Sequence, residues 1–236
     1  MTVLVTGASG LVGSHVVAAL RERGERVRAL VRPASREVVA GLGAEAVVGD
    51  ATDAGAWTRA AQGVDAIVHA AAIVGRRASW EAYLAANLEA TRLATAAAAD
   101  ARARLVHLSS VAVYRGTAAY HVGAARRTEA EPFGPIPERD FYGRSKRMAE
   151  AVVREAAERG TIDAVALRPD VIYGERDRLF TPRVLGRSGA RSSRRSAAGR
   201  TTSPACTRAT SPPPPSPRSP PPPRPPRPRG GSGSTT

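Results

Sequence analysis

The stretch Thr6-Gly7-Ala8-Ser9-Gly10-Leu11-Val12-Gly13 decides the fold that we expect for this chain of 236 residues. It follows a short apolar segment, residues 3–5, that is typical of a buried strand, and it opens a helical pattern over residues 11–23 that Gly24 ends. A strand, a glycine loop and a helix in this order direct free N–H groups and the positive end of the helix dipole toward a pyrophosphate. We therefore expect a dinucleotide site. The spacing is G-x-x-G-x-x-G, and a glycine turn that merely starts a helix is the alternative.

Strand and helix patterns alternate over the remainder of the first 185 residues. Apolar strands are expected at residues 26–31, 46–48, 66–68, 105–108 and 164–167, and helices at residues 80–99 and 142–159. Such alternation predicts a parallel sheet covered by helices on both faces, which is an α/β, Rossmann-like, doubly wound fold.

The residues that end the second expected strand bear on the choice of dinucleotide. Folds that prefer NAD usually place Asp or Glu there, against the ribose 2′-hydroxyl. This chain reads Ala29-Leu30-Val31-Arg32-Pro33, without an acid, and Arg32 could pair with a 2′-phosphate. The pattern favours NADP(H) over NAD(H), with a solvent-exposed arginine as the alternative. Asp50, after the third strand, could accept a hydrogen bond from the adenine amine or belong to a helix cap near Thr52-Asp53.

A proton-transfer centre is expected where the fifth strand ends. Tyr142 and Lys146 are four residues apart in a helical stretch, so their side chains face the same way. A nearby ammonium lowers the pKa of a tyrosine, which can then exchange a proton with a substrate hydroxyl or carbonyl near neutral pH. Ser110 follows the strand at the carboxyl edge of the sheet, where its hydroxyl could hold the same substrate oxygen.

In this order the motifs resemble extended short-chain dehydrogenases/reductases, the NAD-dependent epimerase/dehydratase group. The resemblance covers residues 1–185. It rests on residues 6–13, Gly49-Asp50, His69-Ala70-Ala71-Ala72, Asn87, Ser109-Ser110-Val111-Ala112-Val113-Tyr114, residues 142–146, Arg168-Pro169 and Tyr173-Gly174. It implies an enzyme that moves a hydride between nicotinamide and a hydroxyl/carbonyl pair of a sugar-nucleotide, steroid or flavonol-like substrate.

The resemblance also implies site residues. Ser110, Tyr142 and Lys146 would be catalytic. The implied cofactor-binding residues are Thr6, Gly7, Ser9, Gly10, Leu11, Val12, Gly13, Arg32, Asp50, Ala51, Ala70, Ala71, Ala72, Asn87, Tyr142, Lys146 and Pro169. Residues 168–174, followed by residues 177–180, look most like hydroxysteroid dehydrogenases or dihydroflavonol reductases.

Weaker candidates concern the substrate and a metal. Tyr114, His121 and Tyr173 are candidates for a substrate pocket, with surface positions as the alternative. The histidines show no metal-ligand spacing, so no metal site is expected.

Residues 186–236 differ from the rest in composition. They contain ten Arg and no Asp, Glu or Lys, and therefore supply +10 of the net charge of +14; they also contain 13 of the 19 Pro and the single cysteine, Cys206. The high pI thus belongs to this tail and is weak support for specific nucleic-acid binding by the folded part. We expect a cytoplasmic protein without a signal peptide or membrane helix, a small-molecule substrate, and the homodimer that the resemblance allows.

The tail contains only Arg, Gly, Ser, Ala, Thr, Pro and Cys. All of these have codons with G or C at the second position, which a one-base slip in a GC-rich gene would produce. Our hypothesis is a frameshift just after Leu185, so that residues 1–185 form an incomplete dinucleotide-binding domain with a truncated substrate lobe. The alternative is a genuine disordered Arg/Pro tail in polyproline II conformation that binds SH3-like domains or nucleic acid.

Loss of the substrate lobe would leave apolar sheet surface uncovered, and we expect the chain as written to fold poorly or to lack turnover. Two functions besides an oxidoreductase or epimerase stay open. One is a regulator that senses a dinucleotide on the same fold, and the other is an interaction protein that acts through its tail.

Overall fold

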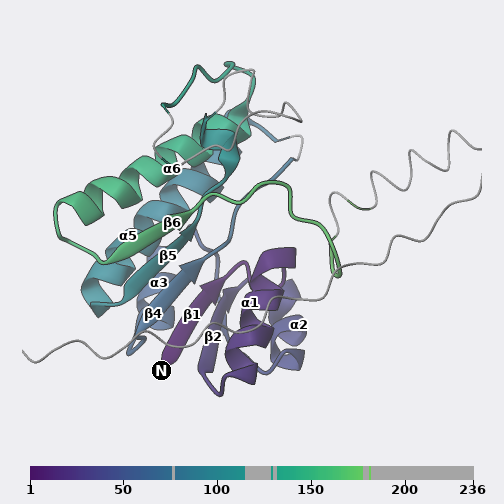
Figure 1. The fold of residues 1–236 in the computed structure, drawn as a ribbon. Coiled ribbons are helices and arrows are strands. Elements are labelled where there is room, and N and C mark those ends of the chain that lie inside the picture. Colours follow the sequence, from purple (N-terminus) through teal and green to yellow (C-terminus); the bar gives the residue numbers. More distant parts are fainter. Residues whose placement is uncertain (76–77, 115–128, 130–131, 178–180, 182–236) are drawn as a thin grey trace, which may run out of the picture. The chain divides into compact units, whose positions relative to one another are not determined.

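The computed structural model describes residues 1–75, 78–114, 129, 132–177 and 181. At its centre lies a six-stranded sheet of order β3-β2-β1-β4-β5-β6, in which all neighbouring strands are parallel (Figure 1). The strands are β1 (Thr2–Thr6), β2 (Arg26–Val31), β3 (Glu45–Val48), β4 (Ala66–His69), β5 (Arg104–Leu108) and β6 (Ala164–Leu167). This is the doubly wound order of a Rossmann fold, and it confirms the expected fold class. The direction of the order changes between β1 and β4, where ligands of such sheets bind outside the carboxyl ends of the strands.

The helices between the strands agree only in part with the sequence pattern. They are α1 (Leu11–Glu22), α2 (Arg36–Gly41), α3 (Ala54–Ala61), α4 (Trp80–Tyr83), α5 (Ala90–Ala101) and α6 (Phe141–Glu158). Short 3₁₀ turns, η1 (Pro33–Ser35) and η3 (Val111–Tyr114), follow β2 and β5. The periodicity does not predict α2 or α3. The single helix expected at residues 80–99 is α4 and α5 joined by a π-helical turn, η2 (Leu84–Glu89).

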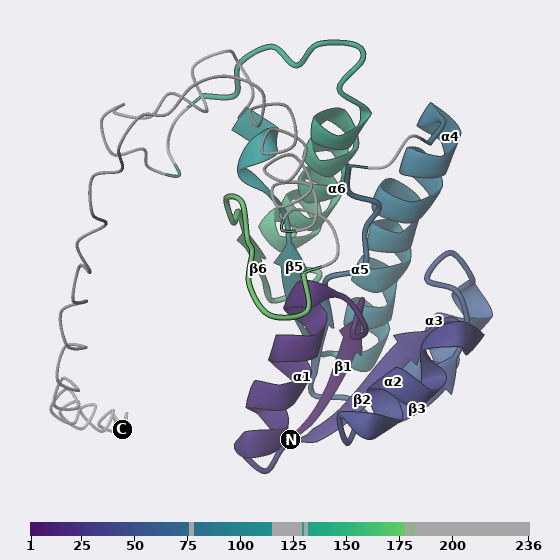
Figure 2. The same ribbon diagram turned by 90° about the vertical axis from the view of Figure 1, so that its right-hand side faces the viewer.

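Two apolar layers hold the sheet between the helices. On one face Leu4, Ile67 and Leu105 pack against α3, α5 and α6, and the other face packs Val3 and Val5 against α1 and α2. Figures 1 and 2 show α1 and α5 on opposite sides of the strands. Apolar residues on both faces of β1 explain why this strand reads as a continuous hydrophobic run.

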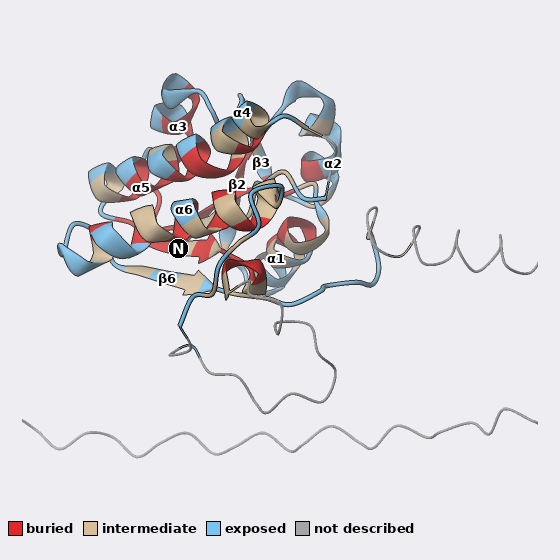
Figure 3. Cartoon of the chain, turned by 90° about the horizontal axis from the view of Figure 1, so that it is seen from above, coloured by how far each residue is buried: buried red, intermediate tan, exposed pale blue. Residues whose placement is uncertain are grey.

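The edge strand β6 is less covered than the centre of the sheet, as its tan and pale blue colouring in Figure 3 shows. Ala164 packs into the layer of α6, so Val165 and Leu167 point to the opposite face, where their exposed fractions are 36% and 47%. Apolar sheet surface therefore reaches solvent at this edge, as we expected.

The remaining expectations concern the tail and a membrane helix. The tail and its boundary after Leu185 fall outside the described residues. Within the described ranges, none of the helices combines the length and the apolar composition needed to cross a bilayer.

Candidate functional site

The glycine loop between β1 and α1 is fixed by close backbone contacts. The Gly10 N–H donates to the Gly7 carbonyl at 2.9 Å, and Gly7 adopts a left-handed φ of 68°. A Cβ on Gly13 would lie 2.1 Å from the Gly7 oxygen, and a Cβ on Gly7 would lie 2.8 Å from the carbonyl carbon of Ala70. The three-residue spacing thus lets α1 pack on its own loop and lets that loop touch the segment after β4. The first-turn N–H groups of α1 have no acceptor within the helix, so they are available to a ligand at this end of the helix.

The segment after β4, residues 70–73, is held from both sides. The hydroxyl of Thr6 accepts a hydrogen bond from the Ala71 N–H at 3.2 Å. The Asn87 side-chain oxygen accepts from the Ile73 N–H at 2.7 Å, and its amide donates to the Ile73 carbonyl and to the Ser145 hydroxyl at 3.2 and 3.0 Å. Asn87 lies in the π-helical turn η2 and so connects the segment after β4 to α6. Such turns are frequent at functional sites.

A chain of hydrogen bonds fixes the protonation of the buried His69. The Thr91 hydroxyl donates to the Asn87 carbonyl at 2.6 Å, so it must accept from the His69 Nε2–H at 3.2 Å. His69 Nδ1 then accepts from the Thr6 hydroxyl at 2.8 Å. Burial, and secondarily the charge of Lys146, lowers the pKa of His69 to about 3. The imidazole is therefore neutral, and β1, β4 and α5 are tied together behind the glycine loop.

Lys146 and Ser110 both lie at the carboxyl end of β5. Asp140 caps α6 by accepting from the Gly143 N–H at 3.0 Å, and the packing of α6 on the sheet leaves Lys146 only 2% exposed. Its ammonium donates to the Leu108 carbonyl, two residues before Ser110. Ser110 is also buried, and its oxygen accepts from the Ala112 N–H at 3.2 Å.

The start of α6 lies against the segment that carries Ser110. A Cβ on Gly143 would lie 3.1 Å from the Ala112 carbonyl, so the small residue after Tyr142 permits this approach. Tyr142 itself is half-buried. Pro169 is beside Ser110 as well, since its carbonyl accepts from the Val111 N–H at 3.1 Å.

Burial lowers the pKa values of the basic side chains at this end of the sheet. Desolvation lowers the pKa of Lys146 from 10.5 to about 8, although the nearby carboxylate of Glu150 raises it. Burial also lowers the pKa of His107, which stacks on His69 with ring centroids 5.7 Å apart. Lys146, the single lysine of the chain, is thus a cation that loses its proton close to neutral pH.

The candidates for the adenosine end follow β2 and β3. Arg32 is exposed, and Ser9 in the glycine loop donates to the hydroxyl of Ser35 at 3.0 Å. Asp50 accepts from the N–H and hydroxyl of Thr52 at 2.9 and 2.8 Å, and these bonds lower its pKa. The N-cap of α3 is Asp53, so Asp50 shapes the turn before that helix. The Ala51 carbonyl accepts from the indole of Trp57, a buried residue of α3.

The weaker candidates are scattered. Tyr114 accepts a hydrogen bond from Arg168, Tyr173 is 70% exposed, and His121 lies outside the described residues. In the part of the chain that the structure describes, no group of three or more His, Cys, Asp or Glu side chains could hold a metal ion.

Sequence reasoning missed Glu150 and gave Arg168 no role. Glu150 is buried on α6, and its carboxylate pairs with the Arg168 guanidinium. The available signal was the i, i+4 spacing from Lys146 to Glu150, which puts a carboxylate on the face of α6 that carries the ammonium.

Comparison with known proteins places these features in a family. A model of the NAD dependent epimerase/dehydratase family matches residues 3–199. A ketoreductase of 4-hydroxy-2-methyl-3-oxo-4-farnesyl-3,4-dihydroquinoline-1-oxide from Stigmatella aurantiaca is 32% identical over 87% of this chain and 60% of its own length. A 3-beta-hydroxysteroid dehydrogenase of Mycolicibacterium neoaurum is 32% identical over 78% of this chain and 50% of its own length. Among solved structures, MoeE5 in complex with UDP-glucose and NAD is 30% identical, with a TM-score of 0.64, over 78% of this chain and 60% of that one. The chain thus spans about half to 60% of the length of these relatives.

Proposed function

The chain belongs to the NAD-dependent epimerase/dehydratase family of enzymes, and on that premise we propose that it is an NAD(P)-dependent oxidoreductase acting on a hydroxyl/carbonyl pair. The observation that carries the proposal is the contact of the buried Lys146 ammonium with the Leu108 carbonyl. Leu108 is two residues before Ser110, and Lys146 is one helical turn after Tyr142. These groups lie at the carboxyl edge of the sheet, where dinucleotides bind in this fold.

The residues around the glycine loop fit a bound dinucleotide. The first turn of α1 leaves backbone N–H groups for the pyrophosphate, and any side chain on Gly13 would collide with the loop. The segment after β4, held by Thr6 and Asn87, would lie along the nicotinamide half. When bound, the cofactor supplies or accepts the hydride.

The protein side of the reaction is a proton transfer. In the direction of reduction Tyr142 gives its hydroxyl proton to the substrate oxygen, and the Lys146 ammonium stabilises the tyrosinate that remains. Ser110 donates a hydrogen bond to the same oxygen and so orients the carbonyl. Oxidation reverses these steps, with the tyrosinate as base.

We propose NADP(H) as the preferred cofactor, on the basis of the residues after β2. Arg32 stands where an acid would select NAD, its guanidinium is exposed, and Ser9 and Ser35 add hydroxyls beside the glycine loop. That MoeE5 was solved with NAD shows that such folds also take the dinucleotide without the 2′-phosphate.

For the substrate we propose a carbonyl or hydroxyl on a largely apolar molecule. The ketoreductase and the hydroxysteroid dehydrogenase named above support this class. A sugar nucleotide is the other candidate, supported by the UDP-glucose bound to MoeE5.

The test is Tyr142→Phe, with Tyr83→Phe as the matched control. Both variants should bind NADPH as the parent does, and more tightly than NADH. Turnover of a panel of ketones should fall about 10²–10⁴-fold only in Tyr142→Phe, because the acid is lost. Turnover is measured on the 236-residue chain and, where that chain has none, on the chain continued in the alternative reading frame after Leu185. A Tyr142→Phe variant with full turnover contradicts the proposed chemistry, and binding without turnover in either chain favours the regulator.

A further inference from the structure

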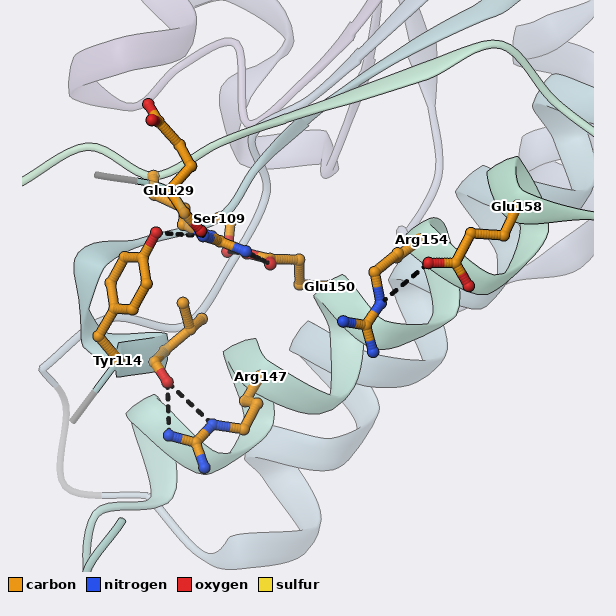
Figure 4. A network of polar contacts seen from close by, with 9 residues as sticks. Ser109, Tyr114, Glu129, Arg147, Glu150, Arg154 and Glu158 are labelled. Atoms are coloured by element: carbon orange, nitrogen blue, oxygen red, sulfur yellow. Dashed lines mark hydrogen bonds and ion pairs between the residues drawn. The ribbon is translucent and has the colours of Figure 1, made fainter. Parts of the chain in front are cut away.

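Glu150 gathers donors from the ends of two strands. The Arg168 Nε, directly after β6, donates to both oxygens of Glu150 at 3.0 Å, and a terminal nitrogen of Arg168 pairs with Oε1. The hydroxyl of Ser109, directly after β5, donates to Oε2 of the same carboxylate, and Figure 4 shows Ser109 and Glu150 side by side. One carboxylate on α6 thus holds β5 and β6 together where the candidate site lies.

Aromatic rings shield this ion pair from water. The Arg168 guanidinium lies 4.7 Å from the ring centroid of Tyr114 and 5.2 Å from that of Phe133, and it donates to the Tyr114 hydroxyl. The side chains of Arg168 and Glu150 are 19% and 6% exposed. A shielded pair of this kind acts on its neighbours more strongly than a solvated surface pair.

The pair is connected to the proposed catalytic groups on two sides. Glu150 is one helical turn beyond Lys146 on the same face of α6, and Ser109 adjoins Ser110. Lys146 also donates to Leu108, so residues 108–110 are bound to α6 twice.

We propose that Glu150 and Arg168 are a positioning pair for this site. Together they fix the end of β5 that carries Ser110. The carboxylate of Glu150 also stabilises the ammonium form of Lys146, and the guanidinium of Arg168 partly offsets that stabilisation. The inference rests on the proposed function for the role of Lys146, but not for the charge coupling itself.

The groups that face Lys146 make the coupling testable. They are Glu150 and Tyr142 on α6, His69 on β4 and His107 on β5, and both histidines have pKa values lowered by burial. Glu150 in turn faces Arg168, Arg154 and Ser109. Burial raises the pKa of Glu150, but the hydrogen bonds from Arg168 and Ser109 and the charges of Arg168 and Arg154 together lower it by more, so the carboxylate is ionised. Without the carboxylate, burial alone acts on Lys146 and lowers its pKa. Without Arg168, the carboxylate is no longer balanced and raises it.

The experiment uses Lys146 as the single lysine of the chain. Lysine labelled with ¹³C at Cε gives one resonance, whose pH titration reports the pKa of Lys146 without any need for turnover. We expect E150Q to lower this pKa and R168Q to raise it, each by about half a unit or more. R159Q removes a cation at the end of α6 that pairs with Glu155 at the exposed surface, and it should leave the titration unchanged.

Shifts in the same direction, or no shift in either variant, overturn the proposal, because a purely structural pair would alter stability without opposite shifts. Should a single variant not fold, the double variant E150Q/R168Q removes both charges of the pair, and it should still lower the pKa of Lys146 because Glu150 is the charge that raises it. An unchanged titration in the double variant also overturns the proposal. A failure of the Tyr142→Phe test with these shifts intact would remove the proposed reaction but not the coupling.

Discussion

At the scale of single residues, Gly13 shows how space rather than flexibility selects an amino acid. Its backbone is that of an ordinary helix residue, so no left-handed φ requires glycine there. The requirement comes from the Gly7 carbonyl, which a Cβ would approach to 2.1 Å. Neither partner can give way cheaply, because the backbone of α1 fixes the position of the Cβ and the carbonyl belongs to the backbone of the loop.

We therefore expect Gly13→Ala to separate α1 from its loop. Binding of NADPH should weaken by at least about tenfold, with a lower melting temperature, as measured by fluorescence titration and thermal unfolding. Gly41→Ala is the control, since nothing lies within 4 Å of a Cβ at the end of α2. Equal affinity of Gly13→Ala and the parent would show that the dinucleotide does not use this loop.

At the scale of elements, β4 and β5 place two histidines side by side in the core. His69 and His107 are register partners, both are buried, and neither ring nitrogen of His107 has a hydrogen-bond partner within the described residues. Burial lowers the pKa of His69 from 6.5 to about 3 and moves that of His107 in the same direction. The unfolded chain therefore binds protons that the folded chain does not, over the interval from about pH 6.5 downward.

The free energy of unfolding should accordingly fall as the pH drops below 6.5, with a slope of at most about 1.4 kcal/mol per pH unit for each histidine. His107→Leu should remove the contribution of one histidine and flatten this dependence, as followed by urea denaturation between pH 4 and 8. His15→Leu, on the exposed side of α1, serves as the comparison. An unchanged slope in His107→Leu would mean that His107 takes up its proton in the folded state.

The same scale shows what a sequence can reveal. The glycine loop and the spacing of Tyr142 and Lys146 are local patterns, so the sequence alone predicts both. The alternation of strand and helix patterns likewise predicts the parallel sheet. Helix α2 spans only Arg36–Gly41, too short for a clear period, and the π-helical turn that holds Asn87 leaves no mark in helical periodicity. The pairing of Glu150 with Arg168 depends on how β6 docks beside β5, which no local pattern encodes.

At the scale of the whole molecule, the exposed edge and the greater length of the relatives raise the question of what covers β6. Val165 and Leu167 on β6, and Val171 and Ile172 after it, are between 36% and 49% exposed, and the chain spans about half to 60% of the relatives compared above. Exposed apolar side chains that lie together on a surface are normally covered or bind a partner. We propose that the covering segment is encoded after Leu185 in another reading frame, in place of residues 186–236.

Reading the encoding DNA from about codon 180 in all three frames is the first step, and continuing the chain in the frame that resembles the family is the second. The restored chain should melt at a higher temperature and bind less of a hydrophobic dye, because its added segment covers the exposed apolar side chains of β6. Leu167→Ser supplies the matched comparison: it should reduce dye binding by the 236-residue chain and destabilise the restored one, where the same side chain becomes buried. Stop codons soon after Leu185 in both other frames would instead make the Arg/Pro tail a real feature of this protein, and deleting residues 186–236 would then test whether it binds a partner.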